Sequence, residues 1–153
     1  MKIIEYIPER AVEIADLFHH SIHSIDTSVY SIEQQEAWAA TPPDYDRWTA
    51  RLLVRKPYLA IIENKVAGFI ELESDGHIDC LYTSPNYQRR GVARALFNHI
   101  LNLARNSGNK RLYVEASLVA KPLFEKFGFT VIRENSLERN QQTLTNYSMQ
   151  KLL

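Results

Sequence analysis

The second half of the chain alternates between strand-like and helix-like segments, and this order constrains the fold more than any other feature. A short alternating run at residues 77–83 precedes the longest amphipathic helix pattern, at residues 91–108, and another strand-like run follows at residues 111–117. Two strands joined through a helix pair in parallel when they share a sheet, because the crossover returns the chain to the same end. The sequence therefore predicts a mixed sheet of the α/β class with helices packed against it.

The remaining segments extend this sheet within one domain. Strands are expected at residues 2–7, 58–63, 66–73, 129–134 and 144–152, and helices at residues 8–25, 31–40, 44–54 and 118–128. Asn64-Lys65 and Asp75-Gly76 are typical of hairpin turns, and Ser31 is a candidate helix cap. No repeat or linker-like composition divides the chain, so we expect a single domain over residues 1–153.

Charge and cysteine content exclude several classes of protein. The 18 basic side chains balance 18 acidic ones, whereas proteins that coat nucleic acid or anionic membranes carry a basic excess. Cys80 is the only cysteine, which excludes an intramolecular disulfide and a cysteine-based zinc cluster. The first residues do not resemble a signal peptide, and no apolar run approaches the roughly 20 residues that span a bilayer. We therefore expect a soluble cytoplasmic protein without nucleic-acid or membrane partners.

The turn before the long helix has the chemistry of an anion site. The first N–H groups of a helix lack intrahelical partners, and the helix dipole favours negative charge there. Gly91 has no Cβ, so the main chain can approach a bulky group closely. Arg89, Arg90 and Arg94 add donors suited to phosphate oxygens, which together indicate a diphosphate. The alternative is an ordinary solvated helix start. The glycine-rich motifs of triphosphate and dinucleotide sites are absent.

The residues of this turn resemble a known family. Gln88-Arg89-Arg90-Gly91-Val92-Ala93 is similar to the Q/R-x-x-G-x-G/A motif of the GNAT superfamily of N-acetyltransferases. Residues 77–97 resemble that family's fourth strand, loop and third major helix, and residues 114–129 resemble its fifth strand and the helix ending in a Gly-Phe pair. The resemblance implies the GNAT-like acyl-CoA N-acyltransferase fold, with acetyl-CoA as co-substrate. It is strongest over residues 66–132.

The same resemblance assigns the residues that would bind CoA. The pyrophosphate would meet the N–H groups and charges of Arg89, Arg90, Gly91, Val92, Ala93 and Arg94. The pantetheine arm would lie between the fourth and fifth strands, against the main chain of Leu81, Tyr82 and Thr83. The Leu81 N–H would polarise the thioester carbonyl. Ser117 stands where the family often has an asparagine that contacts the pantetheine region, and a serine retains part of that role.

Acetyl transfer to an amine needs a proton acceptor and a proton donor. His77 and Asp79 share one face of a strand, and histidine titrates near neutrality, so His77 is the candidate base with Asp79 tuning it. His77 also occupies a position that carries a general-base glutamate in some family members. The alternative is a surface histidine and an aspartate paired with an arginine. Phe124 occupies the place of a tyrosine that many members carry, so Tyr147, Tyr82 or solvent would donate the proton.

The family resemblance points to the early helices for the acceptor pocket. His23, Tyr30 and Trp38 are the candidate substrate-binding residues, with a helix-capping or core role as the alternative. His19 and His23 have the i, i+4 spacing of zinc ligands, but no glutamate lies between them and no third ligand is evident, so no metal is expected.

Nearby acidic residues would attract a cationic acceptor locally; they are Asp26, Glu33, Glu36 and Asp79. Strand alternation places Cys80 on the face opposite His77 and Asp79, as a core residue.

These features favour an N-acetyltransferase in which an amine of a small molecule or peptide attacks the thioester of acetyl-CoA directly. Phe124 keeps a second hypothesis open, a CoA-binding sensor with little catalysis. A third is a domain whose arginine cluster binds phosphorylated partners. Small amines, amino acids, antibiotics, polyamines and protein N-termini all remain candidate acceptors. Because family members are often dimers, the resemblance also implies a homodimer.

Overall fold

The computed structural model describes residues 1–153 and contains one seven-stranded mixed sheet in the order β1-β2-β3-β4-β5-β7-β6. The strands are β1 (Lys2–Glu5), β2 (Tyr58–Ile62), β3 (Lys65–Leu72), β4 (His77–Thr83), β5 (Arg111–Ser117), β6 (Thr130–Arg139) and β7 (Gln142–Leu152). The helices are α1 (Ala11–His23), α2 (Ile32–Trp38), α3 (Tyr45–Arg55), α4 (Val92–Asn106) and α5 (Lys121–Lys126), with short 3-10 turns at Pro8–Arg10 and Pro85–Tyr87. The predicted mixed sheet is confirmed, with β4 and β5 as its parallel pair.

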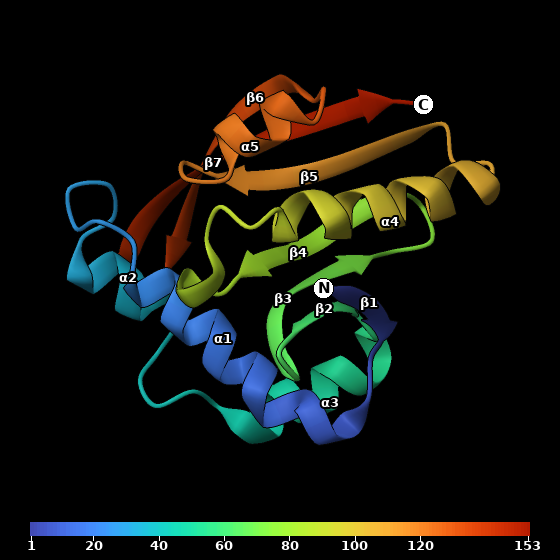
Figure 1. Cartoon of the computed structure of the whole chain (residues 1–153). Helices are drawn as coiled ribbons and strands as arrows, with labels where there is room; N and C mark the ends of the chain where they lie inside the picture. Colours follow the sequence, from blue (N-terminus) through green and yellow to red (C-terminus); the bar gives the residue numbers. More distant parts are fainter.

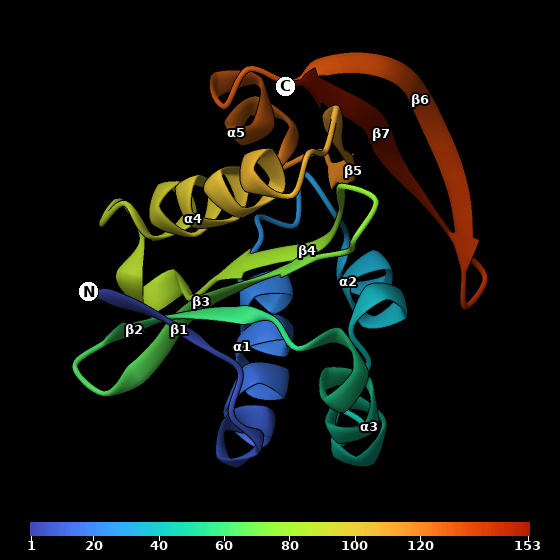
Figure 2. The same ribbon diagram turned by 90° about the vertical axis from the view of Figure 1, so that its right-hand side faces the viewer.

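Helices cover both faces of the sheet. Figure 2 shows α4 and α5 on one side and α1 and α3 on the other. Leu96 and Ile100 of α4 pack with Ile70, Ile78 and Leu112 of the sheet. The opposite core joins α1 and α3 to β2 and β3 through Ile14, Leu17, Leu52, Leu59 and Phe69. None of these helices has the length and apolar character needed to cross a membrane.

Strands β4 and β5 separate soon after they meet. They pair only at His77–Tyr113 and Ile78–Val114. Beyond this point β4 stays with β3, and β5 stays with β7 (Figure 1). Backbone groups on the β5 side of the later β4 residues therefore have no strand partner. This leaves an opening in the middle of the sheet.

Strand β4 carries a bulge at Asp79. Cys80 is paired with Glu71 of β3, whereas Ile78 is paired with Leu72, so Asp79 is the extra residue. A bulge breaks the strict alternation of side chains. Arg51 of α3 contacts both Asp79 and Cys80, so the prediction that these two residues face opposite sides of the sheet is wrong.

The β6–β7 hairpin is longer than the sequence predicts. Its turn, Asn140-Gln141, has positive φ at both residues, as a type I′ hairpin turn requires. The hairpin end is held against α2: Gln34 Nε2 donates to the Thr143 carbonyl (2.9 Å) and Asn140 Nδ2 to the Ala37 carbonyl (3.1 Å). Residues 135–143 are mostly polar and exposed, and for this reason the hydrophobic pattern gave no strand signal there.

Candidate active site

Two cavities adjoin at the open part of the sheet. The first, which we call the inter-strand cavity, has a volume of about 420 Å³ and lies between β4 and β5. The second, the helical cavity, has a volume of about 570 Å³ and lies between α1, α3 and the segment after α2. Both are lined by Trp38, Asp79, Cys80, Tyr82 and Arg139. This shared wall is where a group held in one cavity can reach a group held in the other.

The arginine turn lies at the start of α4. Gly91 is the N-cap in a left-handed conformation (φ 75°), and a Cβ added there meets no atom within 4 Å. The space in front of the helix is therefore open. The guanidinium groups of Arg90 and Arg94 stack over aromatic rings, and none of the three arginines forms an ion pair. Their charge is thus available to an anion. Of the other predicted CoA contacts in this turn, Val92 is buried in the core and Ala93 is half-buried.

Except for Thr83, the predicted pantetheine contacts line the inter-strand cavity. Leu81, Tyr82 and Thr83 pair with β3 and have no partner on β5. Leu81 and Tyr82 line the cavity. Ser117 also lines it, although its hydroxyl accepts a hydrogen bond from the Ala120 N–H at 3.1 Å. This arrangement leaves main-chain groups of β4 available to a ligand.

Phe124 lines the same cavity and is 2% exposed. Its ring meets Phe127 and Phe129 edge-on, with centroids 5.9 and 5.0 Å apart. The tyrosine slot of the family motif is therefore filled by a ring that packs in the core and supplies no proton.

Tyr30 lines the same cavity as Phe124. The hydroxyl donates to the Thr145 carbonyl (3.1 Å) and accepts from the Leu118 N–H (2.9 Å). Burial raises the pKa of Tyr30, and the Leu118 N–H offsets part of this effect. Tyr30 was predicted as an acceptor contact, but it lies in the inter-strand cavity. Its neighbour Trp38, with ring centroids 5.3 Å apart, lines both cavities.

Tyr147 lies elsewhere. Its hydroxyl donates to Glu134 Oε1 at 3.3 Å, and the Lys121 ammonium lies 5.3 Å from its ring centroid. It lines neither cavity. Its position on the outer hairpin argues against a role as proton donor.

Asp79 lies in the shared wall, and His77 does not. Asp79 Oδ2 is 2.6 Å from Arg51 Nη2 and 3.7 Å from Arg55 Nη2. His77 lines neither cavity; its Nδ1 is 2.7 Å from Glu73 and its Nε2 is 2.8 Å from Glu115. Burial lowers the pKa of His77, but the two carboxylates outweigh it and leave the pKa above its ordinary value. With a carboxylate beside each ring nitrogen, neither nitrogen of His77 has a lone pair directed at a substrate proton.

The family of this chain is decided by comparison with known proteins. A family model described as the acetyltransferase (GNAT) domain matches residues 26–151. The chain belongs to the GNAT acetyltransferase family.

Relatives of this GNAT chain span nearly its whole length. It is 32% identical over 149 residues to the uncharacterized N-acetyltransferase YafP of Escherichia coli (strain K12), covering 97% of this chain and 94% of that one. A GCN5-related N-acetyltransferase of Rhodopseudomonas palustris is 35% identical over 99% of this chain and 95% of its own, with a TM-score of 0.93. The structure of yncA, a putative acetyltransferase of Salmonella typhimurium with its cofactor acetyl-CoA, shares the fold (TM-score 0.76, 16% identity, coverage 99% and 93%).

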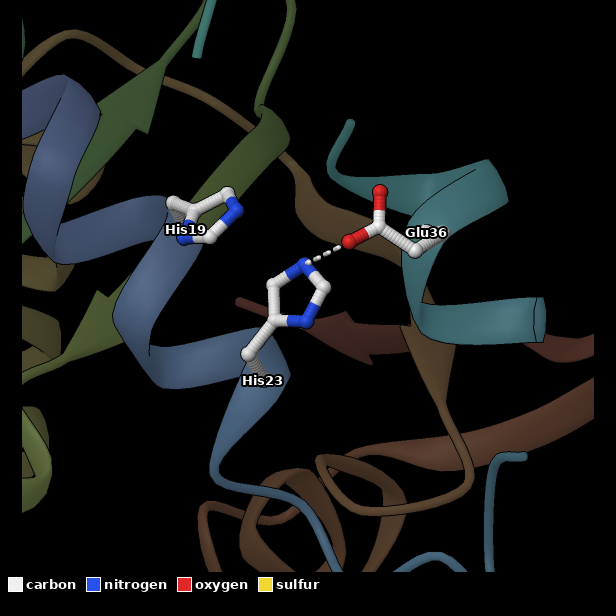
Figure 3. A group of neighbouring side chains, drawn as sticks. All are labelled: His19, His23 and Glu36. Atoms are coloured by element: carbon white, nitrogen blue, oxygen red, sulfur yellow. Dashed lines mark ion pairs between the residues drawn. The ribbon is translucent and has the colours of Figure 1, made fainter. Parts of the chain in front are cut away.

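The histidines of α1 support one wall of the helical cavity of this GNAT enzyme. Figure 3 shows His19 and His23 beside Glu36 of α2. The ring nitrogen His23 Nε2 is 2.7 Å from the Ala39 carbonyl and His19 Nε2 is 2.7 Å from the Thr41 hydroxyl, which donates to Glu36 at 2.6 Å. Glu36 lies close enough to His19 and His23 for the three side chains to share a metal ion, a neighbour that sequence spacing did not reveal. These internal hydrogen bonds already satisfy the ring nitrogens on that side. Of the two histidines, His19 lines the helical cavity and the predicted contact His23 does not.

Sequence reasoning missed the charged network behind the shared wall. Arg51 Nη2 bridges Asp79 and the Glu71 carboxylate, which is 2.7 Å away and only 1% exposed. Burial raises the pKa of Glu71, and Arg51 counteracts part of the rise. Burial also raises the pKa of the Cys80 thiol well above its ordinary value, so it stays protonated. Glu71 could have been found from the sequence, because it is a charged residue within an otherwise apolar strand pattern.

Proposed function

We propose that this GNAT acetyltransferase transfers an acetyl group from acetyl-CoA to an amine by direct attack. The observation that carries the proposal is the wall shared by the two cavities. A donor extended along the inter-strand cavity and an acceptor in the helical cavity meet there. The Salmonella typhimurium neighbour with acetyl-CoA supports the choice of donor.

The donor side follows from the opening of the sheet. The pantetheine amides pair with the main chain of Leu81 to Thr83, which has no β5 partner. The pyrophosphate lies at the N-terminus of α4, against Gly91 and the unpaired arginines of the turn. Leu81 N–H is the proposed donor to the thioester oxygen as negative charge develops on it. Phe124 and Ser117 form the cavity wall beside the arm.

The transfer requires two proton movements. The lone pair of a neutral amine attacks the thioester carbonyl carbon, and the C–S bond then breaks with its electron pair on sulfur. The nitrogen loses a proton, and the departing thiolate gains one, giving an amide and free CoA. Asp79 is the proposed proton acceptor, directly or through water, because it lies in the shared wall. His77 acts behind it as a charged neighbour, and the Tyr30 hydroxyl is the proposed donor to sulfur.

The lone cysteine supports direct attack. A covalent acetyl-enzyme intermediate needs an activated nucleophile, and the thiolate is the nucleophilic form of cysteine. Cys80 lines both cavities, but burial keeps its thiol protonated. Initial rates measured against both substrates should therefore give intersecting rather than parallel double-reciprocal lines.

Gly91→Glu tests the donor assignment. The new carboxylate would project into open space beside the proposed pyrophosphate position, so calorimetry should show CoA affinity falling at least about tenfold. Gly108→Glu is the matched control, because Gly108 lies at the other end of α4, also has positive φ (80°) and also has open space around it. Equal CoA affinity of the Gly91 variant and this control would refute the pyrophosphate site. Absence of acetyl-CoA binding to the wild type would refute the function.

A further inference from the structure

Two arginines that line the helical cavity have no acidic partner. The charged residues of its lining are Arg47, Arg51, Arg139, Asp44 and Asp79. Arg51 is engaged by Glu71 and Asp79. Arg47 and Arg139 make neither an ion pair nor a side-chain hydrogen bond with the protein. Both guanidinium groups are therefore free to bind a ligand.

The acidic side of the cavity is largely occupied. Asp79 is already bound by Arg51 and Arg55. Asp44 Oδ1 caps α3 by accepting the Arg47 N–H at 3.1 Å. The other acidic residues predicted near the acceptor, Asp26, Glu33 and Glu36, line neither cavity. A strongly cationic acceptor would therefore meet free arginines rather than free carboxylates.

The residue that follows Arg139 is anchored to α2. Arg139 is the last residue of β6, next to the turn whose Asn140 donates to the Ala37 carbonyl at 3.1 Å. This contact fixes the hairpin end against α2 (Figure 2). Arg139 lines both cavities, so it belongs to the wall where the acceptor amine must reach the thioester.

Four aromatic side chains also line the helical cavity. Phe18 packs against Trp48 and Tyr82, with ring centroids 4.7 and 4.9 Å away, and all three line the cavity. Trp38 adds a fourth ring from the end of α2. An apolar group of the acceptor would bury against these rings.

We propose that the acceptor is an apolar α-amino acid or a close analogue, whose carboxylate is bound by Arg139 and whose side chain lies among the aromatic rings. Arginine binds carboxylates through paired, charge-assisted hydrogen bonds. The amine must reach the shared wall to react, and Arg139 lines that wall. A carboxylate on the carbon next to the amine would therefore lie close to Arg139. Arg47 of α3 adds a second positive charge to the cavity lining. The proposal rests on the proposed acetyl transfer and names the acceptor class for the same site.

Matched amines test the acceptor class. L-Phenylalanine, L-phenylalaninamide and 2-phenylethylamine differ mainly in the acid group, as do L-leucine, L-leucinamide and 3-methylbutylamine. In a thiol-release assay, the kcat/KM of each free amino acid should exceed that of its matched amide and amine about tenfold or more. Arg139→Gln should reduce this preference to below about threefold, and Arg47→Gln should reduce it less. Arg105→Gln, an exposed arginine at the end of α4, should leave it unchanged.

Binding gives a readout that does not need turnover. Both tryptophans of the chain, Trp38 and Trp48, line the helical cavity, so their fluorescence should report an occupant. With CoA present, N-acetyl-L-phenylalanine should bind about tenfold more tightly than its amide, and Arg139→Gln should abolish the difference.

Several outcomes would overturn the acceptor class. One is a kcat/KM for the amides and amines that equals or exceeds that of the acids, and another is turnover of spermidine or aminoglycosides alone. The others are an Arg139→Gln effect that is equal for acid and amide, or no change of fluorescence with the acids. If acetyl-CoA binds normally in these experiments, the donor assignment stands and only the acceptor class fails. If acetyl-CoA does not bind, the proposed function fails first.

Discussion

Arg51 and Asp79 form an ion pair, with Nη2 2.6 Å from Oδ2, that joins α3 to the bulge of β4 at the wall between the two cavities. The same nitrogen is 2.7 Å from the buried carboxylate of Glu71. The Arg51 guanidinium therefore pairs both with Asp79, which lines the cavities, and with Glu71, which is buried behind it. The bulge allows this, because a regular strand would direct Asp79 and Cys80 to opposite faces.

Arg51→Met should destabilise the protein by about 3 kcal/mol, because it leaves Glu71 buried without its partner. Urea unfolding at neutral pH would measure the loss. Without the guanidinium, the folded-state pKa of Glu71 rises further above its unfolded value, so the folded variant binds more protons. The deficit relative to wild type should therefore shrink as the pH is lowered toward about 5. Arg47→Met, on the same helix and without an ion pair, should change stability by less than about 0.5 kcal/mol. Equal losses in the two variants would contradict the role of Arg51.

His77→Gln should alter the pH dependence of stability. The carboxylates of Glu73 and Glu115 raise the folded-state pKa of His77 despite its burial. Its stabilising contribution is therefore complete below the unfolded value of about 6.5 and is lost as pH rises through the folded pKa. The melting temperature of the variant should lie furthest below wild type near pH 5.5 and approach it near pH 8.5. His20→Gln is the control, since His20 is exposed and has no ion pair. A gap that stays constant with pH would contradict the assignment.

Gly68→Ala should disturb the contact between β3 and the start of α4. An added Cβ would lie 2.8 Å from Val92 Cγ1, 3.0 Å from the Tyr82 carbonyl oxygen and 3.1 Å from Leu96 Cδ1. The carbonyl oxygen is backbone and cannot move aside freely, so the cost should be about 1–3 kcal/mol in urea unfolding. Adding Val92→Ala removes the closest contact. The double variant should therefore lose less stability than the sum of the losses of the two single variants. Additive effects of the two substitutions would show that this contact is not the cause.

Local patterns predicted the helix and strands that form the proposed donor site. Periodicity located β4 and β5 at their observed bounds, and Gly91 and Gly108 mark the two ends of α4. Ser31 does cap α2, accepting the Gln34 N–H at 3.1 Å. Such features depend on neighbouring residues, so a single sequence contains them.

The proposed acceptor side was much less predictable, because it depends on contacts between distant segments. The bulge at Asp79 shifts side chains by one place, which strand alternation does not show. Arg51 and Glu71 meet only after α3 packs on the sheet. Arg139 reaches the cavities through a polar hairpin that carries no hydrophobic pattern, and its neighbour Asn140 is anchored 103 residues away on Ala37. Of the acidic residues expected near the acceptor, only Asp79 lines the helical cavity, and it is paired with Arg51, whereas two arginines of the lining are unpaired.

Tyr30→Phe should slow acetyl transfer about 100-fold in kcat if the Tyr30 hydroxyl protonates the departing thiolate. The same change also leaves the Leu118 N–H without its acceptor, so a loss of activity alone would not identify the role. Phe124→Tyr in the Tyr30→Phe background separates the two effects. Phe124 lies on α5 and lines the same cavity, so this change adds a hydroxyl there without restoring the hydrogen bond to the Leu118 N–H. We expect it to recover at least about tenfold in kcat while the lost thermal stability stays lost. If the double variant folds and binds CoA but recovers neither kcat nor thermal stability, solvent remains as the proton source and Tyr30 is removed from the mechanism.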